Sequence, residues 1–277
     1  MKLRMLIFPL LLLSILSSCK TKHVKSYWSN SISIDGKLSD WDKFVYLDDV
    51  KSAVAVANND SFLYVAFKTN DKTVAKKIVM NGLTVWLKAK GLKSPKYGIK
   101  YPIKPEADFR NLNNKVFAPP YRINRRTNSP PDISNLINIV QKQQTGFEVY
   151  GPGKDDIVIL GFNNREGIRV SIGIYKGQFA YELKFPIFYD PDESHYSLSV
   201  KQKDIVTLKL ESKPELPEQQ NRPRFGSPSG GLPPRQGARG GQHGSMPGIE
   251  RGGNMPRMNS LTQGFSLKIK VELEEHH

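Results

Sequence analysis

The sequence contains one cysteine, Cys19, so the chain cannot form an internal disulfide and must be stabilised through its core. Histidines are few, and those at positions 23, 195 and 243 are too dispersed in the sequence to suggest a zinc site. The stretch at residues 151–154 lacks the length and the Ser or Thr of a phosphate loop. Carboxylates are plentiful, but none is placed for paired acid-base work. We therefore expect a protein that is not an enzyme and that binds no cofactor.

The sequence has only one long hydrophobic run, at residues 5–16. This run follows the positive charges of Lys2 and Arg4. The run is too short for a permanent transmembrane helix, and its position is typical of a signal peptide. The sequence Leu-Ser-Ser-Cys at positions 16–19 resembles the lipobox of bacterial lipoproteins. This resemblance implies that residues 1–18 are removed and that Cys19 carries a lipid anchor. The alternative is that Cys19 is an ordinary residue near a signal cleavage site and carries no lipid.

Acidic residues are absent directly after Cys19, where Lys20, Thr21 and Lys22 follow. In lipoproteins an Asp beside the Cys would resemble an inner-membrane retention signal, and an acidic cluster would resemble a surface-export signal. We therefore expect a cell-envelope protein that is anchored at the outer membrane and faces the periplasm. Residues 19–30 are interpreted as its lipidated tether.

Negative charge is scarce relative to positive charge, and the formal net charge is +15. The excess is concentrated between residues 86 and 126, where eleven Lys or Arg accompany two carboxylates. A basic surface often binds nucleic acid, but an exported protein meets little of it. We expect no nucleic-acid partner; lipopolysaccharide, acidic glycans and solubility stay open as reasons for the charge.

Alternating apolar and polar residues dominate residues 31–212 and predict β-strands. In residues 83–88, for example, Leu83, Val85 and Leu87 share one face, whereas Trp86 lies on the other. No strand-helix-strand repetition argues for a parallel sheet. The prediction is an all-β fold, a two-sheet antiparallel β-sandwich.

Proline-rich residues at about 89–145 interrupt this pattern, and we interpret them as an insertion into the sandwich. The insertion contains one clear helix signal, because Ile133, Leu136, Ile137 and Val140 would form an apolar face. The full fold prediction is therefore a β-sandwich with a Pro-rich insertion that carries a short helix.

Residues 213–261 are rich in Gly, Pro and Arg and contain few large apolar side chains. Such a segment cannot offset the entropy cost of ordering, so we expect a disordered loop. Alternation returns in residues 262–277, which predicts the final strand of the sandwich, paired beside residues 204–210. The loop is therefore expected to lie inside the domain.

Two short patterns resemble a known family. Residues 34–41 (Ile-Asp-Gly-Lys-Leu-Ser-Asp-Trp) resemble the opening of the family 9-like carbohydrate-binding modules, and residues 179–186 resemble a late strand of that family. These modules are β-sandwiches related to DOMON domains, so the resemblance implies this fold and a glycan or similar polar ligand. From the residues alone, Asp35 and Gly36 indicate a tight turn between two strands.

The candidate ligand-binding residues share one property: they lie on the polar faces of their predicted strands. They are Tyr64, Trp86, Arg169, Glu182 and Lys184. If those strands are neighbours, the five form one cluster, in which Trp86 stacks on a sugar ring and Glu182 accepts hydrogen bonds from hydroxyl groups. Two plainer interpretations are open: the insertion covers Trp86, and Glu182 forms a cross-strand ion pair with Arg169.

The opening pattern itself is expected to be structural. Trp41 follows the turn and is predicted to pack under the first hairpin. Asp35, Asp40 and Asp42 are close in sequence and can suggest a structural calcium site. Their spacing is not that of an EF-hand, and a turn with solvated carboxylates explains them as well. We assign no other metal-binding residue.

Two functions fit these features. The first is a non-enzymatic, membrane-anchored carbohydrate-binding module of the cell envelope, whose partners are a glycan and, through the lipid on Cys19, the membrane. The alternative is a structural or interaction lipoprotein. In that case the sandwich is a scaffold, and the basic loop at 213–261 binds an envelope protein or an anionic surface.

Overall fold

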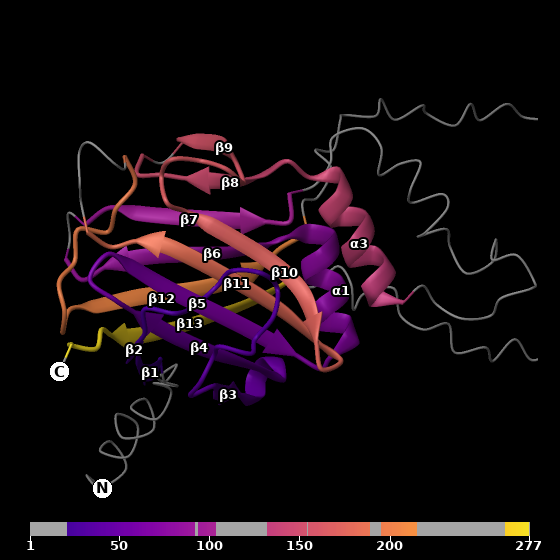
Figure 1. The fold of residues 1–277 in the computed structure, drawn as a ribbon, viewed down its shortest axis with the longest axis horizontal. Helices are drawn as coiled ribbons and strands as arrows, with labels where there is room; N and C mark the ends of the chain where they lie inside the picture. Colours follow the sequence, from indigo (N-terminus) through magenta and orange to yellow (C-terminus); the bar gives the residue numbers. More distant parts are fainter. Residues whose placement is uncertain are drawn as a thin grey trace, which may run out of the picture.

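Two β-sheets pack face to face, and two helices close one end of the layers (Figure 1). The computed structural model describes residues 21–91, 94–103, 132–153, 155–188, 195–214 and 264–276. The predicted signal peptide, Cys19 and nearly all of the loop at 213–261 lie outside the described residues. Among the residues that are described, no helix is long and apolar enough to cross a membrane. The predicted all-β, two-sheet sandwich is confirmed.

The seven-stranded sheet has the spatial order β1 (Lys22–Lys25), β13 (Phe265–Glu272), β12 (Ile205–Ser212), β6 (Leu83–Ala89), β7 (Lys96–Tyr101), β8 (Gly146–Tyr150) and β9 (Ile157–Gly161). The six-stranded sheet has the order β10 (Arg169–Tyr175), β11 (Gln178–Pro186), β5 (Phe62–Thr69), β4 (Ser52–Asn58) and β2 (Tyr27–Trp28), and β3 (Val45–Leu47) also pairs with β4. In Figure 1, β10 and β11 cross over β6 and β7. The helices are α1 (Lys72–Asn81), α3 (Ile133–Gln143) and a 3₁₀ turn at Asp48–Val50.

The helix predicted in the insertion is present as α3. Leu136, Ile137 and Val140 are buried, as the apolar spacing requires, and Asp132 caps the helix by accepting a hydrogen bond from the Ser134 amide. The insertion itself is shorter than predicted. β7 lies within it and pairs with β6 and β8, because Tyr97, Ile99 and Tyr101 alternate with outward-facing residues.

The predicted tether at 19–30 is wrong for residues 22–28, which form β1 and β2 instead. β1 pairs in parallel with β13, and β2 pairs in parallel with β4, so this short segment joins the edges of the two sheets. The sandwich is therefore antiparallel except at its N-terminal strands. Sequence alternation did not reveal them because each is only two to four residues long.

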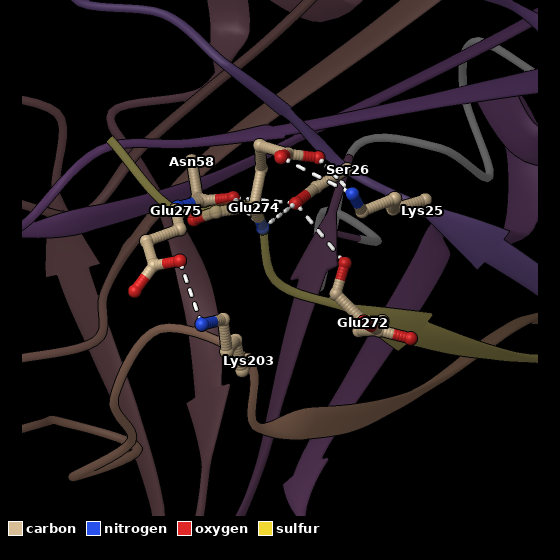
Figure 2. A network of polar contacts seen from close by, with 7 residues as sticks. All are labelled: Lys25, Ser26, Asn58, Lys203, Glu272, Glu274 and Glu275. Atoms are coloured by element: carbon tan, nitrogen blue, oxygen red, sulfur yellow. Dashed lines mark hydrogen bonds and ion pairs between the residues drawn. The ribbon is translucent and has the colours of Figure 1, made fainter. Parts of the chain in front are cut away.

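A buried polar network fixes this segment to the C-terminal end of the chain (Figure 2). The Ser26 hydroxyl donates to the Asn58 side chain, and the Glu274 amide donates to both of these side chains, at 2.8 and 3.0 Å. The Asn58 amide group donates in return to the Glu274 carbonyl at 3.0 Å. Nearby, Lys25 forms an ion pair with Glu274 at 2.9 Å. These contacts hold the N-terminal strands β1 and β2 against the end of the last strand, β13.

Residues 29–44 were expected to begin with a strand and a hairpin turn, but they contain no strand and lie over the outer face of the six-stranded sheet. Along β4 the valines at 54 and 56 face the core between the sheets, whereas Ala55 and Ala57 face outward. Leu38 and Trp41 pack on these small side chains. Alanine leaves room for a further layer, which explains the alternation of Ala and Val in β4.

The pairing of β12 with β13, predicted from sequence, is present and places Ser212 directly opposite Phe265. Strands paired in this way need only a short connection. We expect that replacing residues 214–263 by Asn-Gly leaves the sandwich folded and raises the free energy of unfolding by roughly 2 kcal/mol, because a shorter loop costs less entropy to close. Chemical denaturation measures this change.

Removal of residues 264–276 is the matched control for the shortened loop. It deletes β13, which pairs with both β1 and β12, and should abolish cooperative unfolding. Loss of the unfolding transition in the Asn-Gly variant would show instead that the long connection stabilises the fold.

Candidate functional site

The Glu182 carboxylate is fully buried on β11 and holds the segment at 29–44 in place. One oxygen accepts a hydrogen bond from the Trp41 indole at 2.6 Å. The other accepts hydrogen bonds from the Gly36 amide at 2.6 Å and the Asp35 amide at 3.1 Å. Trp41 therefore has the structural role that was predicted. Glu182 has a structural role too, because it accepts the hydrogen bond from the Trp41 indole.

The turn at Asp35 and Gly36 lies directly on β10, which explains its glycine. Gly36 has φ +86°, and a Cβ there would lie 2.7 Å from the carbonyl oxygen of Ile172. A Cβ on Gly173 would lie 2.3 Å from the Gly36 carbonyl oxygen. Two glycines in contact let the turn approach β10 closely enough for its amides to reach Glu182.

Burial raises the pKa of Glu182 to about 7, although the hydrogen bonds from Trp41 and Gly36 act to lower it. A raised pKa means that the folded protein binds a proton that the unfolded chain has released. The contribution of Glu182 to stability is therefore largest at low pH and is lost as the pH rises from about 4.5 to about 7.

Replacement of Glu182 by Gln should remove this pH dependence and destabilise the fold, because an amide NH₂ would face two backbone amides. The stability advantage of the wild type over Glu182→Gln should shrink by up to about 3 kcal/mol between pH 5 and pH 8. Urea titrations at the two pH values test this, with the exposed Glu272→Gln as the control. An equal advantage at both pH values would contradict it.

The other candidates on this sheet form a row across three strands. Tyr64 on β5 lies opposite Lys184 on β11, which lies opposite Arg169 on β10. Tyr64 is buried, the Lys184 ammonium lies 3.6 Å from the centre of the Phe62 ring, and Arg169 donates to the Asn164 and Ile168 carbonyls. Desolvation, and then the charge of Arg169, lowers the pKa of Lys184.

The expected cluster of five candidates is wrong, because Trp86 lies on the other sheet. Trp86 is on β6 of the seven-stranded sheet, and its side chain faces away from the six-stranded sheet that carries Glu182. The core of the sandwich separates the two residues. Alternation identifies the face of a strand on which a side chain lies, but not the sheet to which the strand belongs.

Trp86 is partly buried on the outer face of the seven-stranded sheet, and its ring packs against Gly98 on β7. A Cβ at Gly98 would lie 2.6 Å from the indole ring, so only glycine permits this placement. The Trp86 Nε1–H donates to Glu211 at 2.7 Å, and the Tyr150 ring lies beside it with the centroids 5.5 Å apart. The Lys96 ammonium lies 3.9 Å from the centre of the Trp86 ring.

Glu211 is the polar centre of this face. Burial by itself would raise the pKa of its carboxyl, but hydrogen bonds from Lys209, Lys213 and Trp86 outweigh burial and lower the pKa to about 2. The Lys209 and Lys213 ammonium groups lie 2.5 and 3.0 Å from a Glu211 oxygen. Glu211 therefore stays ionised and fixes the orientation of the indole.

Apolar side chains extend this face toward the sheet edge. Ile157 and Ile159 on β9 are 58% and 63% exposed and lie opposite Tyr150 and Glu148 on β8. The outer face therefore carries an aromatic and aliphatic strip from Trp86 through Tyr150 to β9. We define the outer face around Trp86, Tyr150 and Glu211 as the Trp86 face.

Sequence reasoning missed several residues of the Trp86 face. Gly98 and Lys96 lie on β7, where Tyr97, Ile99 and Tyr101 point inward; this alternation was the available signal, but the surrounding prolines concealed it. Lys209 and Glu211 share the polar side of a strand that was predicted correctly. Their proximity to Trp86 follows only from the pairing of β12 with β6.

The acidic residues of the opening turn make local contacts. Asp35 accepts a hydrogen bond from the Lys37 amide at 2.8 Å, and Asp40 accepts one from the Ser33 amide at 2.6 Å. Across the described ranges, no group of three or more His, Cys, Asp or Glu side chains is placed to hold a metal ion. The suggestion of a structural calcium site stays a prediction.

Comparison with known proteins gives a distant structural likeness. No family model and no curated protein matches the chain. Among solved structures, a carbohydrate-binding module of family 9 from Caldicellulosiruptor kristjanssonii, in complex with glucose, is similar over 70% of this chain and 78% of that chain. The identity is 8% and the TM-score is 0.31. The function of this chain must therefore be inferred from its own residues, and its relationship to DOMON domains stays a prediction.

Proposed function

We propose that this protein is a non-enzymatic glycan-binding module and that the Trp86 face is its binding site. The observation that carries the proposal is the partly exposed indole, which lies against Gly98 and donates a hydrogen bond to Glu211 on the outer face of the sheet. An exposed aromatic ring face provides a surface for the C–H groups of a sugar. Because the ring is already oriented, a ligand does not have to order it.

Polar groups around the ring supply the hydrogen bonds that sugar hydroxyl groups need. Tyr150 and Glu148 bond to each other on one side, and Glu211 and Lys209 lie on the other. Lys96 is exposed, and the ammonium group at the end of its side chain lies over the ring. Because the side chain is long and flexible, this group can move aside and contact the ligand. This is the combination of an apolar surface with a few convergent polar groups that is typical of ligand sites.

Of the residues predicted to bind ligand, Trp86 is retained in this proposal. Glu182 and Tyr64 are buried under or beside the segment at 29–44, and Lys184 and Arg169 lie on the same covered sheet. We assign these four a structural role.

Replacement of Trp86 by Ala should abolish glycan binding, while the protein keeps a cooperative melting transition because the ring lies outside the core between the sheets. A glycan array and a thermal scan measure the two effects. Gly98→Val should weaken binding in the same way, because the new side chain displaces the ring. Trp28→Ala, a half-exposed tryptophan on the six-stranded sheet, is the control.

Retained binding by Trp86→Ala would place the site elsewhere on the molecule. Failure of the wild type to bind any glycan would reject the proposed function as a whole.

The proposal includes export and anchoring through a lipid on Cys19, at the outer membrane and facing the periplasm. Since β1 begins at Lys22, three residues after Cys19, an anchored protein would hold the β1 edge of its sandwich beside the membrane. In cells, Cys19→Ala should lose incorporation of radiolabelled palmitate and move from the membrane to the soluble fraction. Membrane association without the cysteine would contradict the anchor.

A second candidate function, partner recruitment by the loop at 213–261, is favoured by one observation. Ser212 and Phe265 are directly opposite, so the strands on either side do not need a long connection. If the loop recruits an envelope protein or an anionic surface, the Asn-Gly variant should keep glycan binding and lose that partner in a pull-down. An unchanged set of partners would identify the loop as a spacer.

A further inference from the structure

Lysines lie directly opposite lysines at two places on the Trp86 face. Lys88 on β6 is paired with Lys96 on β7, and Lys209 on β12 is paired with Lys268 on β13. Side chains that are directly opposite on one face of a sheet lie about 5 Å apart at Cβ, and like charges in that position destabilise the pairing. Both pairs adjoin Trp86, because Lys209 is its direct neighbour on β12 and Lys96 lies over its ring.

Neighbouring carboxylates of the described residues balance these charges only in part, because of the four opposed lysines Lys209 alone pairs with a carboxylate, that of Glu211. Glu211 is shared between Lys209 and Lys213, and Glu148 forms an ion pair with Lys100 at 3.4 Å. Within the part of the chain that the structure describes, Lys88, Lys96 and Lys268 form no ion pair. Lys270 adds a further positive charge opposite Thr207, in the row that contains Lys88.

We propose that the ligand of the Trp86 face is an acidic glycan, one that carries carboxylate or sulfate groups. This inference rests on the proposed function and specifies its ligand class. A sugar ring stacked on Trp86 would place its acidic groups between the two lysine pairs, where ammonium groups make charge-assisted hydrogen bonds. The bound anions would relieve the repulsion that the unliganded face sustains.

The proposal predicts that removal of these lysines has different effects on ligand affinity and on the melting temperature. A lysine that only stabilises the sheet would, when removed, lower the melting temperature. A lysine that binds the ligand but repels another lysine should behave differently. Its removal should lower the affinity for the ligand and should leave the melting temperature unchanged or raise it. Lys88→Gln with Lys268→Gln removes one member of each opposed pair and leaves Lys96, Lys209 and Trp86 in place.

The test uses oligogalacturonate and its methyl ester, which share a backbone and differ in charge, with calorimetry as the readout. The wild type should bind the acid at least tenfold more tightly than the ester, and its affinity for the acid should fall as salt rises. Lys88→Gln/Lys268→Gln should lose tenfold or more in affinity for the acid without a lower melting temperature. Lys72→Gln/Lys142→Gln, which removes two exposed helix lysines, should bind as the wild type does.

Other outcomes distinguish this inference from the proposed function. Equal affinity for acid and ester, lost in Trp86→Ala and kept in the lysine variant, would overturn the acidic ligand and leave the glycan site intact. Binding that neither Trp86 nor the lysines affect would overturn both. Binding to vesicles of anionic phospholipid, with none to oligogalacturonate or to sulfated oligosaccharides, would show that the lysines face a membrane and would overturn the inference.

Discussion

The buried carboxylate of Glu182 determines how the outer layer of this protein is built. A carboxylate without partners could not be buried at this depth, and the Trp41 indole and two backbone amides satisfy it. Those donors come from residues 35–41, which have no regular secondary structure. One side chain on β11 therefore fixes a segment more than a hundred residues earlier in the sequence, and that segment covers the outer face of the six-stranded sheet.

Among the residues that the structure describes, no comparable segment covers the outer face of the seven-stranded sheet. The six-stranded sheet carries outward-facing alanines that accept the segment at 29–44, whereas the seven-stranded sheet carries lysines, glutamates, Tyr150 and Trp86. Two tryptophans thus have opposite roles. Trp41 is buried and donates to Glu182, and Trp86 is half-exposed and donates to Glu211. In each case a carboxylate orients the indole, but of these two rings only that of Trp86 remains partly exposed.

Much of the fold could be predicted from the sequence. Period-two alternation identified most strands, and the spacing of Leu136, Ile137 and Val140 identified the helix in the insertion, because both patterns follow from the geometry of a single element. β1 and β2 were missed because strands of two to four residues carry too little pattern. β7 was missed because prolines on both sides outweighed its alternation. The candidate site was predicted only in part: Trp86 was chosen correctly as an outward-facing residue, whereas its expected partners lie on the other sheet.

The sequence by itself determined which residues of each strand face inward and which face outward, since this depends only on the alternation of successive side chains along one strand. Tertiary structure decided which strands are neighbours and which outer face is covered. Those outcomes depend on contacts between residues far apart in the sequence, such as Glu182 with Trp41 and Lys209 with Lys268. No local pattern encodes them. Glu182 therefore could be placed on a polar face from sequence, but only the packing of residues 35–41 over that face made it a structural residue.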